Sequence, residues 1–196
     1  MDRLARFRQC MQAEADAIEQ TAHALDNTVI EALHLFEYTT GKVIVSGIGK
    51  SGHVGRKIAA SLSSTGTPAH FMHAAEGVHG DLGMITKDDL VILLSNSGET
   101  AEVLNLIPSL KMIGAPIIAI TRVATSTLAK AADVTLTYLC DTEADDLNLA
   151  PTTSSTVMLA LGDALAVTLS AIRHFDRKTF HLYHPGGSLG KALEKK

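Results

Sequence analysis

The chain has 196 residues, of which 46% are hydrophobic, so it suits one domain (1–196) with a sizeable buried core. The formal net charge is −4 and the basic residues are scattered along the chain. This charge pattern argues against a nucleic-acid partner and against an anionic membrane surface.

The compartment follows from the cysteines and the N-terminus. Cys10 and Cys140 form no CxxC or metal-type pattern, and the first residues lack the apolar core of a signal peptide. No run approaches the roughly 20 apolar residues needed to cross a bilayer. We therefore expect a reduced, cytoplasmic protein that binds no membrane.

Residues 1–40 are expected to be helical, because neither Pro nor Gly occurs between Leu4 and Tyr38. Apolar residues at three-to-four spacing would line one face: Phe7, Met11, Ala15, Ile18, Ala22 and Leu25. Asn27 or Thr28 would cap a second helix, with Val29, Leu33 and Phe36 facing inward. Two roles are open for this arm: dimerisation, or packing on its own domain.

The first candidate site follows a predicted strand at 43–45, where the segment 47–52 reads GIGKSG. Val54, Ile58 and Leu62 then recur at helical spacing. Glycines leave backbone N–H groups accessible, and the helix dipole favours an anion at the same place. We expect Gly49, Lys50, Ser51 and Gly52 to contact a phosphate, with Ser51 also serving as the helix N-cap.

Other interpretations of this loop are possible. The glycine spacing fits a dinucleotide fingerprint, with Glu76 as the ribose acceptor. A Walker A loop is excluded because Ile44 stands where its first glycine belongs. A turn that binds nothing is the third possibility. The serine-rich segment 95–100 would be a second phosphate loop, which an NAD-dependent dehydrogenase does not need.

The helix should end at 64–68, before a second strand from Ala69 to Met72. A polar stretch follows, in which four titratable side chains lie within nine residues: His73, Glu76, His79 and Asp81. Their spacing matches no common zinc pattern. We expect substrate contact or proton transfer here, with capping or a metal as the alternatives.

The third predicted strand, Leu90 to Leu94, is apolar throughout, as in a parallel strand covered on both faces. It ends in SNSGET, and one helix is expected over 103–110. The loop supplies a second set of anion ligands: Ser95, Asn96, Ser97 and Thr100. A capping box would explain one or two of these residues, but hardly the whole set.

Two further strands are expected at Pro116 to Ile120 and Val134 to Leu139, separated by a helix that Ser126 caps. Strands alternating with helices specify a doubly wound α/β fold, a three-layer α/β/α sandwich with a five-stranded parallel sheet over 41–196. Ligands in such sheets bind beyond the carboxyl ends of strands, where the strand order reverses.

An acidic loop at 143–151 precedes five consecutive hydroxyl residues, 152–156, which open a long helix. Its buried side would carry Val157, Leu161, Leu165, Leu169 and Ile172. More hydroxyls are present than one N-cap requires, so Thr152 and Ser154 are expected on a third side of the phosphate pocket. A glycine-rich turn at 184–191 holds His184.

These motifs resemble the sugar isomerase (SIS) domain family, and within it the arabinose 5-phosphate isomerases. The matching stretches are GIGKSGHVGRK, STGTP, HAAEGVHGDLGMI, LLSNSGETAEV, EADDLNLAPTTSSTVMLALGDALA and HPGGSLGK. The resemblance implies a flavodoxin-like SIS fold and interconversion of D-ribulose 5-phosphate and D-arabinose 5-phosphate for synthesis of Kdo in lipopolysaccharide or capsule. It also implies a homotetramer with shared active sites.

The resemblance implies five catalytic residues and neither cofactor nor metal. Glu102 is the leading candidate for the base. The alternative is a structural role, in which its carboxylate stabilises the helix N-terminus through the dipole. His184 would assist ring opening in a neighbour's site, His79 and Glu143 would move protons or position hydroxyls, and Lys50 would favour the anionic intermediate. The four titratable groups are interchangeable in these roles.

The chain departs from the family pattern in two respects. Relatives commonly continue into a pair of CBS modules, whereas this sequence ends at Lys196, so we expect a form without that regulation. This chain has Asp145 and Asp146 at positions where relatives often carry less acidic residues, and the two carboxylates should alter the pocket rim. The alternatives are a non-catalytic sugar-phosphate sensor and an isomerase of another sugar phosphate.

Overall fold

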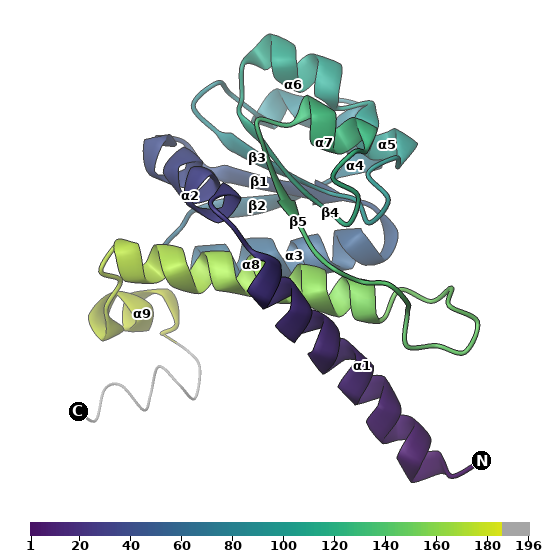
Figure 1. Cartoon of the computed structure of the whole chain (residues 1–196). Coiled ribbons are helices and arrows are strands. Elements are labelled where there is room, and N and C mark those ends of the chain that lie inside the picture. The colour runs from purple at the N-terminus through teal and green to yellow at the C-terminus, as the bar shows by residue number, and fades with distance from the viewer. Residues whose placement is uncertain (186–196) are drawn as a thin grey trace.

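The computed structural model describes residues 1–185; the segment 186–191 of the predicted glycine-rich turn lies outside them. A five-stranded parallel sheet forms the centre of the molecule (Figure 1). Its strands, in the order β2-β1-β3-β4-β5, are β1 (Val43–Gly47), β2 (Ala69–His73), β3 (Leu90–Leu94), β4 (Ile117–Thr121) and β5 (Val134–Thr137). The predicted fold class is confirmed, with β5 ending two residues before the expected Leu139.

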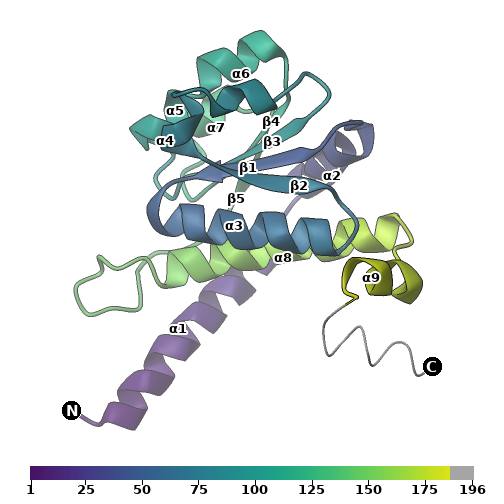
Figure 2. The same cartoon turned by 180° about the vertical axis from the view of Figure 1, so that it is seen from behind.

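Helices cover both faces of the sheet (Figures 1 and 2). One face carries α1 (Arg3–Ala24), α2 (Thr28–Tyr38), α3 (Gly49–Ser64) and α8 (Thr153–Ile172). The other carries α4 (Ala74–Gly77), the 3-10 helix η1 (Asp81–Met84), α5 (Ala101–Leu104), α6 (Ile107–Ile113) and α7 (Thr127–Ala131). A last helix, α9 (Arg177–Tyr183), follows α8. Alternate residues of each strand therefore enter separate cores, as Val45 and Ile44 do.

Helix α8 is long and apolar enough, by length and composition, to cross a membrane, contrary to the expectation of no such segment. Its buried residues instead include Val157, Leu161, Leu165 and Leu169, which belong to the core between the sheet and the helices. Ile172, predicted to be buried, is exposed at the end of the helix. In this structure α8 is a core helix.

Helix α1 is largely exposed in its N-terminal half. Phe7 and Met11 are 66% and 62% exposed, and only Ala17 and Thr21 are buried. Figure 1 shows the reason: the N-terminal half of α1 extends beyond α8 and away from the sheet. Of the two roles left open for this arm, packing on its own domain does not hold for this half of the helix.

Two local predictions are also corrected. Neither Asn27 nor Thr28 caps α2 with its side chain; Asp26 Oδ1 instead accepts hydrogen bonds from the Thr28 N–H (2.9 Å) and hydroxyl (2.7 Å). The single helix expected over 103–110 is divided into α5 and α6. Pro108 has no N–H to bond to the carbonyl of Leu104, so a continuous helix would lose a bond there.

The sheet order brings the two predicted loops together. β1 pairs with β2 on one side and with β3 on the other, with Ser46 beside Leu93, so the strand order reverses between β1 and β3. The loops that leave these two strands lie at the same carboxyl edge. This crevice is the usual ligand site of doubly wound sheets.

Candidate active site

The first loop turns directly into α3, which begins at Gly49. Gly49 has a φ of +59°, a left-handed conformation that favours glycine. Ser51 therefore lies in the first turn of α3 and not at the predicted N-cap position, which Ile48 takes. The Lys50 side chain is exposed and makes no hydrogen bond or ion pair with the described residues. The N–H groups of Gly49, Lys50 and Ser51 and the Lys50 cation are thus available to an anion, whereas the Gly52 N–H donates to the Ile48 carbonyl at 3.1 Å.

The second loop is held in shape by its own hydroxyl groups. Ser95 Oγ lies 2.8 Å from Thr100 Oγ1 and accepts a hydrogen bond from the Gly98 N–H at 3.0 Å. Gly98 has a φ of +69° and packs against Ser126, where a Cβ atom would lie 2.1 Å from the Ser126 hydroxyl. Because α5 has only four residues, the hydroxyl and N–H groups of the loop, more than a helix dipole, would hold an anion.

Two of the hydroxyl residues at the start of α8, Thr152 and Ser154, are directed at Glu143. Its carboxylate accepts hydrogen bonds from the Thr152 N–H (2.8 Å) and hydroxyl (3.2 Å), the Ser154 N–H (3.1 Å) and the Ser154 hydroxyl. Burial acts to raise the pKa of Glu143, but these hydrogen bonds outweigh it and the pKa is lowered. Glu143 is therefore a fixed carboxylate at neutral pH.

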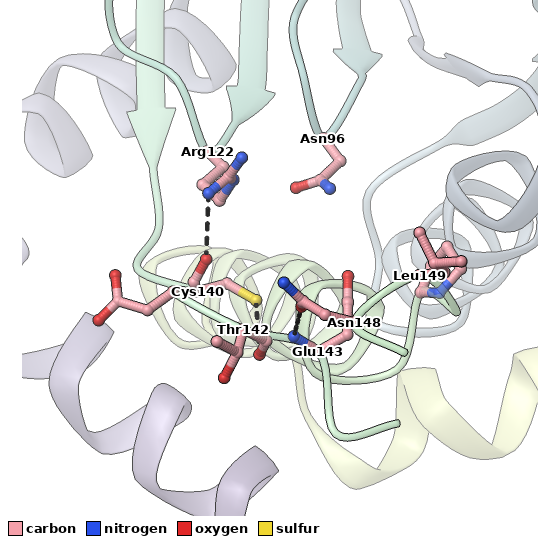
Figure 3. Close-up of a pocket in the computed structure, with 9 residues that line it drawn as sticks. Asn96, Arg122, Cys140, Thr142, Glu143, Asn148 and Leu149 are labelled. Atoms are coloured by element: carbon pink, nitrogen blue, oxygen red, sulfur yellow. Dashed lines mark hydrogen bonds between the residues drawn. The ribbon is translucent and has the colours of Figure 1, made fainter. Parts of the chain in front are cut away.

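A cavity of about 210 Å³ links this carboxylate to the ends of β3 and β4 (Figure 3). It is lined by Asn96, Arg122, Cys140, Asp141, Thr142, Glu143, Asn148, Leu149 and Pro151. Asn96 Oδ1 accepts a hydrogen bond from the buried Tyr138 hydroxyl (2.8 Å), and burial raises the pKa of Tyr138, so this donor stays protonated. The amide of Asn96 is thereby oriented.

Arg122 is one of the cavity residues that sequence reasoning missed. Its guanidinium donates to the Cys140 carbonyl oxygen at 3.3 Å, and the side chain is otherwise exposed to the cavity. Figure 3 shows Arg122 and Asn96 facing the loop that carries Glu143. The signal was present, because Arg122 directly follows the last residue of β4, at the edge where ligands of parallel sheets bind.

His79 and Glu102 also lie at the carboxyl edge of the sheet, after β2 and β3 respectively. Both are exposed, and neither side chain is bonded to a described residue. His73, by contrast, accepts a hydrogen bond from the Ala75 N–H and caps α4. Within residues 1–185 no group of three or more His, Cys, Asp or Glu side chains is arranged to hold a metal.

His184 lies at the opposite end of the molecule. Arg173, which ends α8, donates to the Thr67 hydroxyl (2.9 Å) and the Phe36 carbonyl (3.3 Å), both near the amino-terminal edge of the sheet. Helix α8 spans about 30 Å at 1.5 Å per residue, and Glu143 is bound at its other end. The His184 ring stacks on Phe180 instead, with centroids 4.0 Å apart. Within one chain, His184 is therefore far from the other predicted site residues.

A doubly wound sheet with glycine- and serine-rich turns over its carboxyl edge is a fold of the class that binds phosphorylated small molecules. The SIS domain family matches residues 38–168, and the chain belongs to this family.

Individual relatives were compared in sequence and structure. The chain is 51% identical over 180 residues to the arabinose 5-phosphate isomerase KdsD of Pseudomonas aeruginosa, covering 92% of this chain and 55% of the relative. It is 52% identical over 191 residues to the arabinose 5-phosphate isomerase KpsF of Escherichia coli O6:H1, covering 97% and 58%. The chain thus spans a little over half the length of these relatives.

A solved structure of the E. coli CFT073 protein c3406, in complex with A5P, superposes with a TM-score of 0.92. The two chains are 46% identical, and the match covers 94% of this chain and 98% of that one.

Proposed function

We propose that this protein is an aldose–ketose isomerase that interconverts D-ribulose 5-phosphate and D-arabinose 5-phosphate (A5P). The observation that carries the proposal is the similarity to c3406, whose A5P complex has the same fold over nearly its whole chain at 46% identity. The KdsD and KpsF relatives named as arabinose 5-phosphate isomerases support the same activity.

In this proposal the phosphate lies between the loops after β1 and β3. Its ligands would be Gly49, Ser51, Gly52, Ser95, Asn96, Ser97 and Thr100. Thr152 and Ser154 would form the third side of the pocket, together with the Glu143 carboxylate to which their hydroxyls donate hydrogen bonds. The phosphate is remote from the bonds that change, so its binding energy can fix C1 and C2 against the catalytic groups.

The chemistry requires an open-chain sugar, a base for the proton next to the carbonyl, and stabilisation of an enediolate. Glu102 is the proposed base, since its carboxylate is unpaired among the described residues and follows the phosphate loop. Glu143 and His79 would position hydroxyl groups or move protons between O1 and O2. Lys50 would favour the anionic intermediate. No redox cofactor takes part in such an isomerisation.

The position of His184 supports a shared site. The length of α8 separates this imidazole from Glu143 within one chain, so we propose that it acts in a neighbouring subunit of a homotetramer. We also propose that the protein acts in the cytoplasm and that its product supplies Kdo for lipopolysaccharide or capsule.

One assay tests the function. Purified protein is incubated with ribulose 5-phosphate and EDTA in deuterated water, and the aldose is identified by NMR. We expect arabinose 5-phosphate carrying deuterium at C2. Ribose 5-phosphate as the product would show a different isomerase. Binding of A5P without any exchange at C2 would show a sensor and disprove the proposal.

A further inference from the structure

The acidic loop that carries Glu143 is held mainly by polar contacts of its own. The Asp145 carboxylate accepts hydrogen bonds from the N–H groups of Leu147 (3.2 Å), Leu149 (3.0 Å) and Ala150 (2.9 Å). Leu147 and Leu149 are each 75% exposed, so these two residues give the loop no apolar anchor. What holds this loop to the rest of the protein therefore matters for the position of Glu143.

Helix α1 provides such a contact. Arg6 Nη2 donates a hydrogen bond to the Ala144 carbonyl at 2.5 Å and pairs with Asp146 Oδ1 at 2.8 Å. Ala144 is buried and directly follows Glu143. The Arg6 side chain is only 28% exposed, although Phe7 beside it is 66% exposed. The contact is therefore a specific polar clamp within an otherwise exposed part of α1.

The two halves of the clamp differ in strength. Asp146 is 80% exposed, so its ion pair with Arg6 is screened by water and salt and contributes little. The bond to the Ala144 carbonyl is charge-assisted and partly buried, and it holds the peptide group between Ala144 and Asp145. The Thr152 and Ser154 donors fix the far end of the Glu143 side chain. At the backbone, the Glu143 N–H donates to Asn148 Oδ1 at 2.6 Å and the Ala144 N–H donates to the Thr152 hydroxyl at 2.9 Å. Arg6 adds the contact that ties this stretch of backbone to helix α1.

We propose that Arg6 is a positioning residue, which acts through Ala144 to hold the Glu143 carboxylate in place at the cavity. This inference rests on the proposed isomerase function. A carboxylate displaced by a fraction of an ångström would still leave the phosphate loops after β1 and β3 intact. Loss of the clamp should therefore lower turnover and leave substrate binding nearly unchanged.

The test compares Arg6→Met with Arg8→Met, a matched control on the same helix whose arginine is exposed and bonded to no described residue. We expect Arg6→Met to lower kcat about 10-fold with less than about a twofold change in KM. Arg6→Lys should restore kcat to within about threefold, because one nitrogen makes both contacts and a lysine ammonium can replace it. Arg8→Met should match the wild type.

Hydrogen exchange of residues 144–150 gives a readout independent of activity. Faster exchange there in Arg6→Met, but not in Arg8→Met, supports the clamp. If the wild type is active and Arg6→Met has the same kcat and the same exchange rates as the wild type, the proposal is overturned. Equal losses in both variants, or no rescue by lysine, would also overturn it. A wild type that produces no aldose would instead be a failure of the proposed function, which the first assay detects.

Discussion

At the level of single residues, the two candidate carboxylates at the edge of the sheet are held differently. Glu143 is bound by four donors and its pKa is lowered, whereas Glu102 is exposed and bonded to no described residue. The hydroxyl run at 152–156 predicted a phosphate contact. In the structure, Thr152 and Ser154 instead donate hydrogen bonds that fix the carboxylate of Glu143, a candidate catalytic residue. Sequence could not show this, because the donors and the acceptor are nine or more residues apart.

Replacing Glu102 by Gln tests the proposed base. An amide cannot take a proton, so kcat should fall by about 10² to 10⁴-fold while KM changes modestly. Steady-state kinetics with ribulose 5-phosphate measure both. Glu37→Gln, an exposed position on α2, is the control and should have no effect. Near-wild-type turnover of Glu102→Gln would exclude Glu102 as the base.

Asp89 joins the starts of β1 and β3 and predicts a pH dependence of stability. Its buried carboxylate accepts hydrogen bonds from Lys42 and Thr86, and these outweigh burial and lower its pKa from 3.8 to about 2. The folded pKa lies below the unfolded one, so the contribution of about 2 kcal/mol is present above pH 4 and lost as the pH falls toward 2.

Urea unfolding of Asp89→Asn should therefore show a loss of about 2 to 4 kcal/mol at pH 7 that shrinks below pH 4. Asp88→Asn, the exposed neighbour, serves as the control. A loss that is the same at pH 3 and pH 7 would contradict the assigned ionisation.

At the level of elements, the packing of α3 on α8 depends on a glycine. A Cβ atom at Gly162 would lie 2.3 Å from Ile58 Cγ1, and Ile58 is fully buried. Gly162→Val should therefore reduce the free energy of unfolding by about 1 to 3 kcal/mol through overpacking, despite a better helix propensity than glycine. Ala171→Val, exposed on the same helix, should change it little. Equal stability of the two variants would show that the helices separate without cost.

The elements predicted best were those defined by strong local patterns. β3 has the bounds that its apolar run predicted, and Ser126 caps α7 by accepting from the Ala129 N–H. For α1 the sequence predicted a helix but left its role open, because periodicity gives the apolar face of a helix but not whether anything covers it. The contact that Arg6 makes in its place is polar and spans 138 residues of sequence.

At the level of the whole molecule, the proposed sharing of sites between subunits predicts complementation between inactive variants. His184→Ala and Glu102→Gln should each be inactive alone, and mixed oligomers should regain activity because some sites then receive an intact imidazole and an intact carboxylate. Refolding the two together and assaying A5P formation measures this. A mixture of Lys50→Met with Glu102→Gln is the control. Both positions belong to one edge of one chain, so no recovery is expected there. Failure of the His184 mixture to recover would contradict sharing.

The sequence by itself determined the layered fold, the strands and the two glycine- and serine-rich turns, because each depends on residues close together in the chain. The tertiary structure decided which groups meet. It placed Arg122 beside Glu143 in one cavity, bound Glu143 to the start of α8, and put His184 at the far end of that helix. These contacts depend on the order and lengths of whole elements, and a local pattern of residue types carries no information about them.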